Sequence, residues 1–156
     1  MPPALARDSR ILVLGYGNPG RQDDGLGPAA AEAIERRRFE RVQTSANYQL
    51  AIEDASDAAE CDVVIFVDAS KTGPEPFSVA PVRPSSEVAC FVSHFVRPEY
   101  IMSLCRSVYG RTPRAYLIGI RGYDFDFGEG LTERARENLE IAVSSLCRSI
   151  LGRTEV

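Results

Sequence analysis

Three side chains in this sequence, Asp24, Asp68 and His94, are of the types that bind a divalent metal ion or transfer protons. Asp24 follows a glycine-rich turn, Asp68 follows the apolar run VVIFV, and His94, the single histidine, follows VACFVS. Two carboxylates and one imidazole form a ligand set for a divalent transition metal, with positions left open for water or substrate. The same groups can act as general acids and bases. We therefore expect a site for a cation or for proton transfer.

The first acidic pair lies in a strand–turn–helix unit. An apolar run at 11–14 leads into GYGNPGRQDDGLG, and the pattern predicts a helix at 27–37 with Pro28 in its first turn. Most units of this kind bind phosphate, but adjacent carboxylates at Asp23 and Asp24 would repel it. The pair therefore favours a cation or proton transfer. One member could instead cap the helix or shape the turn, and we expect Asp23 to orient Asp24.

The remaining pattern alternates strands with helices and contains no repeat. We predict strands at 10–15, 41–46, 62–67, 77–82, 88–92 and 115–120, and helices at 27–37, 50–59, 98–109 and from the N-cap Thr132 onward. The apolar strand 62–67 is typical of a central parallel strand, whereas prolines place 77–82 at an edge. The prediction is one α/β domain over 1–156, a three-layer α/β/α sandwich around a mostly parallel, twisted sheet. Ligands gather at the carboxyl ends of such strands, where Asp24, Asp68 and His94 would meet.

Composition and charge exclude several classes of protein. The chain has 156 residues and a net charge of −4, which argues against a nucleic-acid partner. Its N-terminus lacks the apolar core of a signal peptide, and we expect no membrane insertion and a cytoplasmic location. The cysteines Cys61, Cys90, Cys105 and Cys147 form no CxxC pair, so a structural zinc site is not indicated. We expect Cys105 and Cys147 to be buried on helix faces.

Four segments resemble the hydrogenase maturation endopeptidases: ILVLGYGNPGRQDDGLGPAAAEAI, VVIFVDAS, the SH of VSHFVRPEY, and RAYLIGIRGYDFDFGEGLTERARENLE. The resemblance covers nearly the whole chain. It implies an aspartyl-type or metal-dependent protease that removes a short C-terminal extension from the large-subunit precursor of a nickel–iron hydrogenase after nickel insertion. It also implies metal contacts from Asp24, Asp68 and His94, although many members have Glu where this chain has Asp24. Nickel would come with the substrate, with no organic cofactor, and we expect a monomer.

The sequence is compatible with more than one role for the nickel ion, for the two aspartates and for the loops around them. Nickel could polarise the scissile carbonyl or acidify a bound water, or Asp24 or Asp68 could act as general base while nickel only docks the substrate. Gly17 would let the substrate backbone approach closely, and the Asn18 amide could donate to a substrate carbonyl or serve only the turn. The loop 121–130 and the segment 47–50 could line the substrate cleft or lie solvated on the surface.

Four other functions could be inferred from the same segments of the sequence. GYGNPG also resembles the opening of peptidyl-tRNA hydrolases, but QDDGLG follows where those enzymes need a histidine and an asparagine. Gly15, Gly17 and Gly20 match GxGxxG, yet no acidic residue ends the second strand, as a dinucleotide site requires. A non-catalytic maturation module, such as a metal chaperone, would use the same ligands and would leave the polypeptide intact. Ser93 next to His94 does not make a hydrolase pair, because adjacent residues on an extended chain point to opposite faces.

Overall fold

The computed structural model describes residues 2–85 and 96–152. Their strands form one five-stranded sheet with the order β2-β1-β3-β5-β4. β1 (Ile11–Tyr16), β2 (Val42–Asn47), β3 (Val63–Ser70) and β5 (Arg114–Arg121) run parallel, whereas β4 (Phe77–Pro81) pairs antiparallel with β5. The predicted mostly parallel α/β architecture is confirmed, with β3 at the centre and the proline-containing β4 at an edge.

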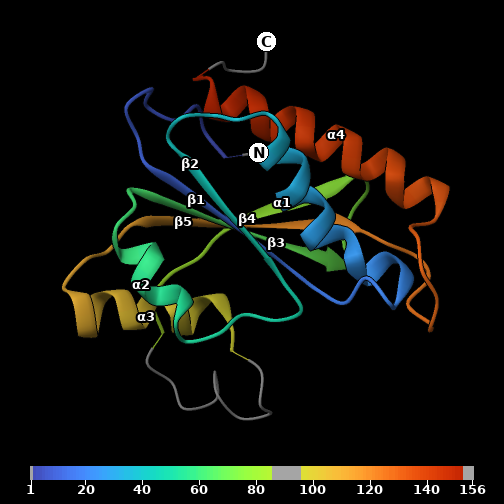
Figure 1. Ribbon diagram of the computed structural model, residues 1–156, viewed down its shortest axis with the longest axis horizontal. Helices are drawn as coiled ribbons and strands as arrows, with labels where there is room; N and C mark the ends of the chain where they lie inside the picture. Colours follow the sequence, from blue (N-terminus) through green and yellow to red (C-terminus); the bar gives the residue numbers. More distant parts are fainter. Residues whose placement is uncertain (1, 86–95, 153–156) are drawn as a thin grey trace.

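Helices cover both faces of this sheet, which makes the predicted three layers (Figure 1). α1 (Leu26–Arg36) and α4 (Glu133–Ile150) lie together on one face, and α2 (Asp54–Ala59) and α3 (Pro98–Tyr109) lie on the other. Each face has its own buried apolar cluster, because alternate residues of β1 and β3 point to opposite sides. Val13 and Ile65 pack on the α1–α4 side, and Leu12 and Phe66 pack on the other.

The caps of α4 and α3 follow the sequence pattern. Thr132 precedes α4 in an extended conformation, and its hydroxyl accepts a hydrogen bond from the backbone N–H of Ala135 at 3.2 Å. α3 ends at Tyr109 and is followed by Gly110, whose φ of +67° is left-handed and therefore favours glycine. The predicted N-cap at Thr132 is confirmed.

β3 is longer than the apolar run predicted. We expected the strand to end at 67 with Asp68 just beyond it, but β3 continues to Ser70. Its pairing with β1 ends at Gly15↔Val67, whereas its pairing with β5 continues to Ser70↔Arg121. Asp68 therefore lies inside the strand, at the first position where β1 no longer pairs with it. The side chains lose their full burial at that point, and this explains why the apolar run stops before the strand does.

Other expectations divide into corrections and confirmations. The helix predicted at 50–59 begins only at Asp54, and the residues before it form a turn in which the Asp54 carboxylate accepts the N–H of Ala51 at 2.8 Å. Cys105 and Cys147 are buried free thiols, as expected. The strand predicted at 88–92 and Cys90 lie outside the described residues. Among the described helices, none has the length and apolar character needed to cross a bilayer.

Candidate active site

Asp24 and Asp68 line the same cavity, of about 620 Å³, at the carboxyl ends of β1 and β3. Asp24 comes from the short 3-10 helix η1 (Gln22–Gly25) between β1 and α1, and Asp68 comes from β3. The cavity is lined by Tyr16, Gly17, Asn18, Arg21, Asp24, Tyr48, Gln49, Leu50, Asp68, Val96, Arg97 and Pro98. The third predicted site residue, His94, lies outside the described residues. The topology thus brings together two side chains that are far apart in the sequence.

The turn after β1 is built around Asp24. The backbone N–H of Asn18 donates to Asp24 Oδ2 at 2.7 Å, and the Asp24 N–H donates to the carbonyl of Arg21. Gly17 has a φ of +146°, and a Cβ placed there would lie 2.0 Å from the backbone oxygen of Asp24. Glycine is therefore required at this position by the chain's own backbone, and not only by an approaching substrate.

Asn18 serves the turn through its side chain. Its Oδ1 accepts the N–H of Gly20 at 2.9 Å, which closes the first part of the loop. The side chain nevertheless lines the cavity beside Asp24. The oxygen of the Asn18 amide therefore stabilises the turn, as one of the two interpretations predicted. A hydrogen bond from the amide nitrogen to the substrate stays a prediction.

Asp68 is half-buried, and this burial raises its pKa to about 7. The N–H of Ala69 donates to Asp68 Oδ1 at 2.8 Å and opposes the shift, whereas the negative charge of Asp24 adds to it. The same surroundings raise the pKa of the Tyr16 hydroxyl, through burial first and then through the charges of Asp68 and Glu99. Tyr16 thus stays protonated, while Asp68 can gain and lose a proton near neutral pH.

Asp23 has a different role from the predicted one. Its side chain is fully buried, and its carboxylate accepts the N–H groups of Tyr123, Asp124 and Thr132 and the hydroxyl of Thr132, at 2.8–3.1 Å. Burial alone would raise its pKa, but these hydrogen bonds outweigh burial and lower it. The hydrogen bonds of Asp23 therefore hold the 121–130 loop and the start of α4 against η1, and they do not run to Asp24.

The sequence reasoning missed three polar cavity residues, Tyr16, Arg21 and Arg97, and their neighbours Val96 and Pro98. Tyr16 is the last residue of β1, and its place between a buried strand and the glycine turn was a usable signal. Arg97 stands directly before Pro98, which opens α3, and Arg21 directly precedes η1. Neither arginine matches a motif, so only the folded chain reveals that both lie beside the aspartates.

The two carboxylates suit a cation, because each is an oxygen ligand and they repel each other across one half-buried cavity. Within the described part of the chain, no group of three His, Cys, Asp or Glu side chains is placed to hold a metal ion. The described residues therefore include two of the three predicted ligands, and metal binding by them stays a prediction.

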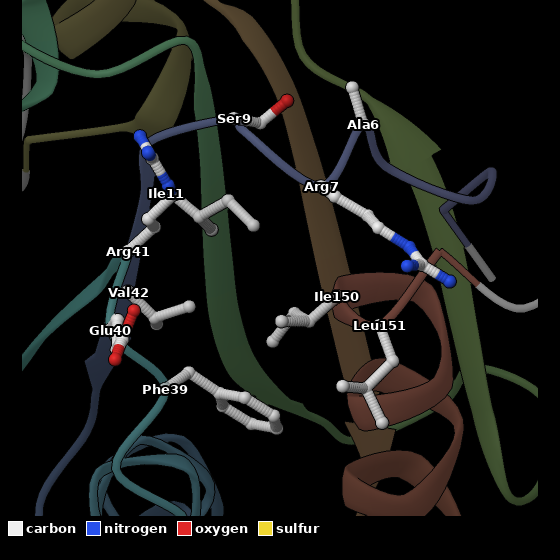
Figure 2. A pocket seen from close by; sticks show the side chains of 10 residues that line it. All are labelled: Ala6, Arg7, Ser9, Ile11, Phe39, Glu40, Arg41, Val42, Ile150 and Leu151. Atoms are coloured by element: carbon white, nitrogen blue, oxygen red, sulfur yellow. The ribbon is translucent and has the colours of Figure 1, made fainter.

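A second cavity, of about 430 Å³, lies at the opposite end of the sheet, where β1 and β2 begin. Figure 2 shows its apolar side, on which Phe39, Val42 and Ile150 point toward one another. Arg7, Glu40 and Arg41 stand at its rim, and all three are exposed to solvent. It contains no half-buried carboxylate, so it lacks the chemistry of the first cavity.

Fold and site together define an α/β protein with two carboxylates in a cleft at the carboxyl edge of its sheet. No protein-family model matches the sequence. The chain is 30% identical over 156 residues to the hydrogenase expression/formation protein HupD of Bradyrhizobium diazoefficiens, an alignment that covers 94% of this chain and 80% of HupD. The chain therefore belongs to the hydrogenase maturation endopeptidase family.

Solved structures agree with this assignment. The hydrogenase maturating endopeptidase HybD of E. coli superposes with a TM-score of 0.71 at 25% identity, over 91% of this chain and 92% of HybD. The fold is also that of the [NiFe] hydrogenase maturation protease HycI of Thermococcus kodakarensis, with a TM-score of 0.73 at 22% identity over 92% and 93% of the two chains.

Proposed function

We propose that this protein is an endopeptidase that removes the C-terminal extension of a nickel–iron hydrogenase large-subunit precursor after nickel insertion. In this proposal, nickel already held by the precursor is recognised by Asp24, Asp68 and His94. The family assignment supports the protease activity and the type of substrate. The observation that carries the proposal is the cavity shared by Asp24 and Asp68, in which Asp68 has a pKa of about 7.

The shared cavity favours a substrate that brings its own positive charge. Two carboxylates in a half-buried space repel each other, and a cation between them removes that repulsion. A precursor that carries nickel supplies such a cation, whereas a precursor without nickel does not. Recognition of the loaded precursor would thus depend on the charge of the two carboxylates, and His94 would add an imidazole to them.

In the proposed hydrolysis, Asp68 acts as the general base. Its carboxylate takes a proton from water, and the water oxygen bonds to the scissile carbonyl carbon to form a tetrahedral intermediate. The C–N bond then breaks, and the proton held by Asp68 passes to the leaving amine. The pKa of about 7 is that of Asp68 in the cavity without nickel, and a nickel ion bound to this carboxylate would lower it. In this step of the proposal Asp24 and His94 therefore hold the nickel while Asp68 takes and returns the proton, and a group with this pKa is suited to both transfers at neutral pH.

Mass spectrometry of a nickel-loaded precursor, incubated with this protein, tests the proposal. We expect loss of one defined C-terminal peptide, and no loss from the precursor that lacks nickel. Asp24→Ala, Asp68→Ala and His94→Ala should each abolish processing while the variants keep the wild-type circular dichroism spectrum. A cognate loaded precursor of unchanged mass would contradict the protease and would favour a metal chaperone, which binds without cutting.

The proposal also includes a cytoplasmic monomer. Its partner, the precursor, needs open access to the cleft at one end of the sheet, and all the described residues that line this cleft belong to one copy of the chain. Size-exclusion chromatography with light scattering should give a mass near 17.1 kDa. A stable dimer would contradict this part alone.

A further inference from the structure

Arg21 lies at the proposed active-site cavity and contacts the ring of Phe127, which is not part of the hydrophobic core. Arg21 is one of the residues that line the cavity shared by Asp24 and Asp68, and its guanidinium carbon lies 4.2 Å from the centre of the Phe127 ring. The Phe127 side chain is 81% exposed, so its ring contributes little to the buried apolar clusters. An exposed ring under a guanidinium does offer a cation–π contact, which restricts the cation to one surface.

The backbone around this pair is fixed at several points. Arg21 and Gly128 form a parallel bridge, in which the Gln22 N–H donates to the Gly128 carbonyl and the Gly128 N–H donates to the Gly20 carbonyl, both at 2.9 Å. The four hydrogen bonds of Asp23 hold the two ends of the same loop. Arg21 and Phe127 thus project from two segments that are tied together. A side chain ordered before binding loses less entropy when a ligand arrives.

The guanidinium of Arg21 has no acidic partner within the described residues. The ion pairs found there within 4 Å join Arg111 to Asp62 and Arg134 to Glu75. A guanidinium offers parallel N–H donors that match a carboxylate. One residue of the cavity lining therefore carries a held cation that has no acidic partner in the described chain, and the same lining includes the carboxylates that we place in catalysis.

We infer that Arg21, supported by Phe127, is a specificity-determining residue that binds a carboxylate of the precursor segment entering the cavity. This inference rests on the proposed function. The carboxylate belongs to an Asp or Glu side chain near the scissile bond; the terminal carboxylate of the extension has the same chemistry, and the experiment separates the two.

The test compares cleavage kinetics of the wild type, Arg21→Gln and the control Lys71→Gln on the nickel-loaded precursor. Lys71 is matched to Arg21, because its Nζ lies 5.0 Å from the centre of the Phe125 ring while its side chain does not line the cavity. We expect Arg21→Gln to raise KM about tenfold with kcat unchanged, since it loses a charge-assisted hydrogen bond used in binding. Lys71→Gln should leave both constants unchanged, and Phe127→Leu should raise KM about threefold.

Precursor variants then identify the carboxylate. Each Asp and Glu near the cleavage point is changed singly to Asn or Gln, and a further precursor carries two added residues that displace its terminal carboxylate. We expect one side-chain change to raise KM for the wild type as much as Arg21→Gln does, and to have no further effect on Arg21→Gln. A matching response to the displaced terminus alone would overturn the side-chain assignment.

The inference is overturned if Arg21→Gln cleaves with the wild-type KM, or if every precursor change adds fully to the Arg21→Gln effect. Both results require that the wild type cleaves the loaded precursor. Failure of the wild type to cleave it would instead count against the proposed function, so the two failures are distinguishable.

Discussion

The two ends of the sheet carry cavities of comparable size but of opposite chemistry. At the carboxyl end, the cavity of about 620 Å³ holds two carboxylates, and burial raises the pKa of Asp68 to about 7. At the amino end, the cavity of about 430 Å³ has an apolar side, with exposed charges at its rim (Figure 2). Volume alone does not distinguish them. The first cavity is distinguished as a candidate site because burial shifts the pKa values of its titratable groups Asp68 and Tyr16.

The largest expected difference between the two ends is in activity. Asp68→Asn keeps the shape of the side chain and an oxygen for the Ala69 N–H, but it cannot accept a proton from water. We expect the rate of precursor cleavage to fall about a thousandfold, as for loss of a general base. Glu40→Gln, the matched change at the rim of the amino-end cavity, should leave the rate unchanged. The rates are measured by mass spectrometry over time. Equal rates for the two variants would contradict the assignment of the active site to the carboxyl-end cavity.

The same substitution, Asp68→Asn, should lower the activity but raise the stability of the folded protein at pH 8. The pKa of Asp68 is about 7 in the folded protein against an ordinary value of 3.8, so the folded state binds this proton more tightly than the unfolded state. Folding stability is therefore lost as pH rises from about 4 to 7, and the loss is complete above 7. Asn has no charge to bury, so Asp68→Asn should be more stable at pH 8 by on the order of 3 kcal/mol.

Urea unfolding at pH 4 and pH 8 measures this effect. The two proteins should have nearly equal unfolding free energies at pH 4, and the difference should open between the two pH values. If Asp68→Asn were less stable than the wild type at pH 8, burial of the ionised Asp68 carboxylate would not destabilise the folded protein.

A smaller effect is expected for the hydrogen bonds that shape the carboxyl end. The Thr132 hydroxyl donates to Asp23 and accepts from the N–H of Ala135, so Thr132→Val removes a cap and leaves a buried carboxylate with one donor fewer. We expect a loss of about 2 kcal/mol in the free energy of unfolding. Thr112→Val, at an exposed position, should change it by less than about 0.5 kcal/mol. Equal values for the two variants would mean that the hydroxyl contributes nothing.

The smallest effect should come from the amino end. Leu151 lines the second cavity and is 42% exposed, so Leu151→Ala removes only partly buried apolar surface. We expect about 1 kcal/mol less stability in thermal unfolding and wild-type cleavage kinetics. A loss of cleavage in this variant, at a temperature where it is folded, would show that the amino end takes part in function.

Much of the fold could be predicted from the sequence because its signals are local. The run VVIFV identifies a central strand, and Thr132 identifies a helix start. The shared cavity of Asp24 and Asp68 followed from one general property of parallel sheets. The contacts of Asp23 could not be predicted, since its partners lie 100–109 residues away and their backbone N–H groups carry no sequence signal. The continuation of β3 past Val67 depends on unequal pairing with β1 and β5, which is a tertiary property.

The long reach of the Asp23 hydrogen bonds has a consequence for synthesis of the protein. A chain emerging from the ribosome can pair β1 with β2 early, because the two strands are close in sequence. The acidic turn acquires its final anchors only when residues near Thr132 have been made and α4 has docked. The turn that carries Asp24 is therefore synthesised long before the contacts of its neighbour Asp23 fix it to the rest of the protein, and the proposed active site is completed late in folding.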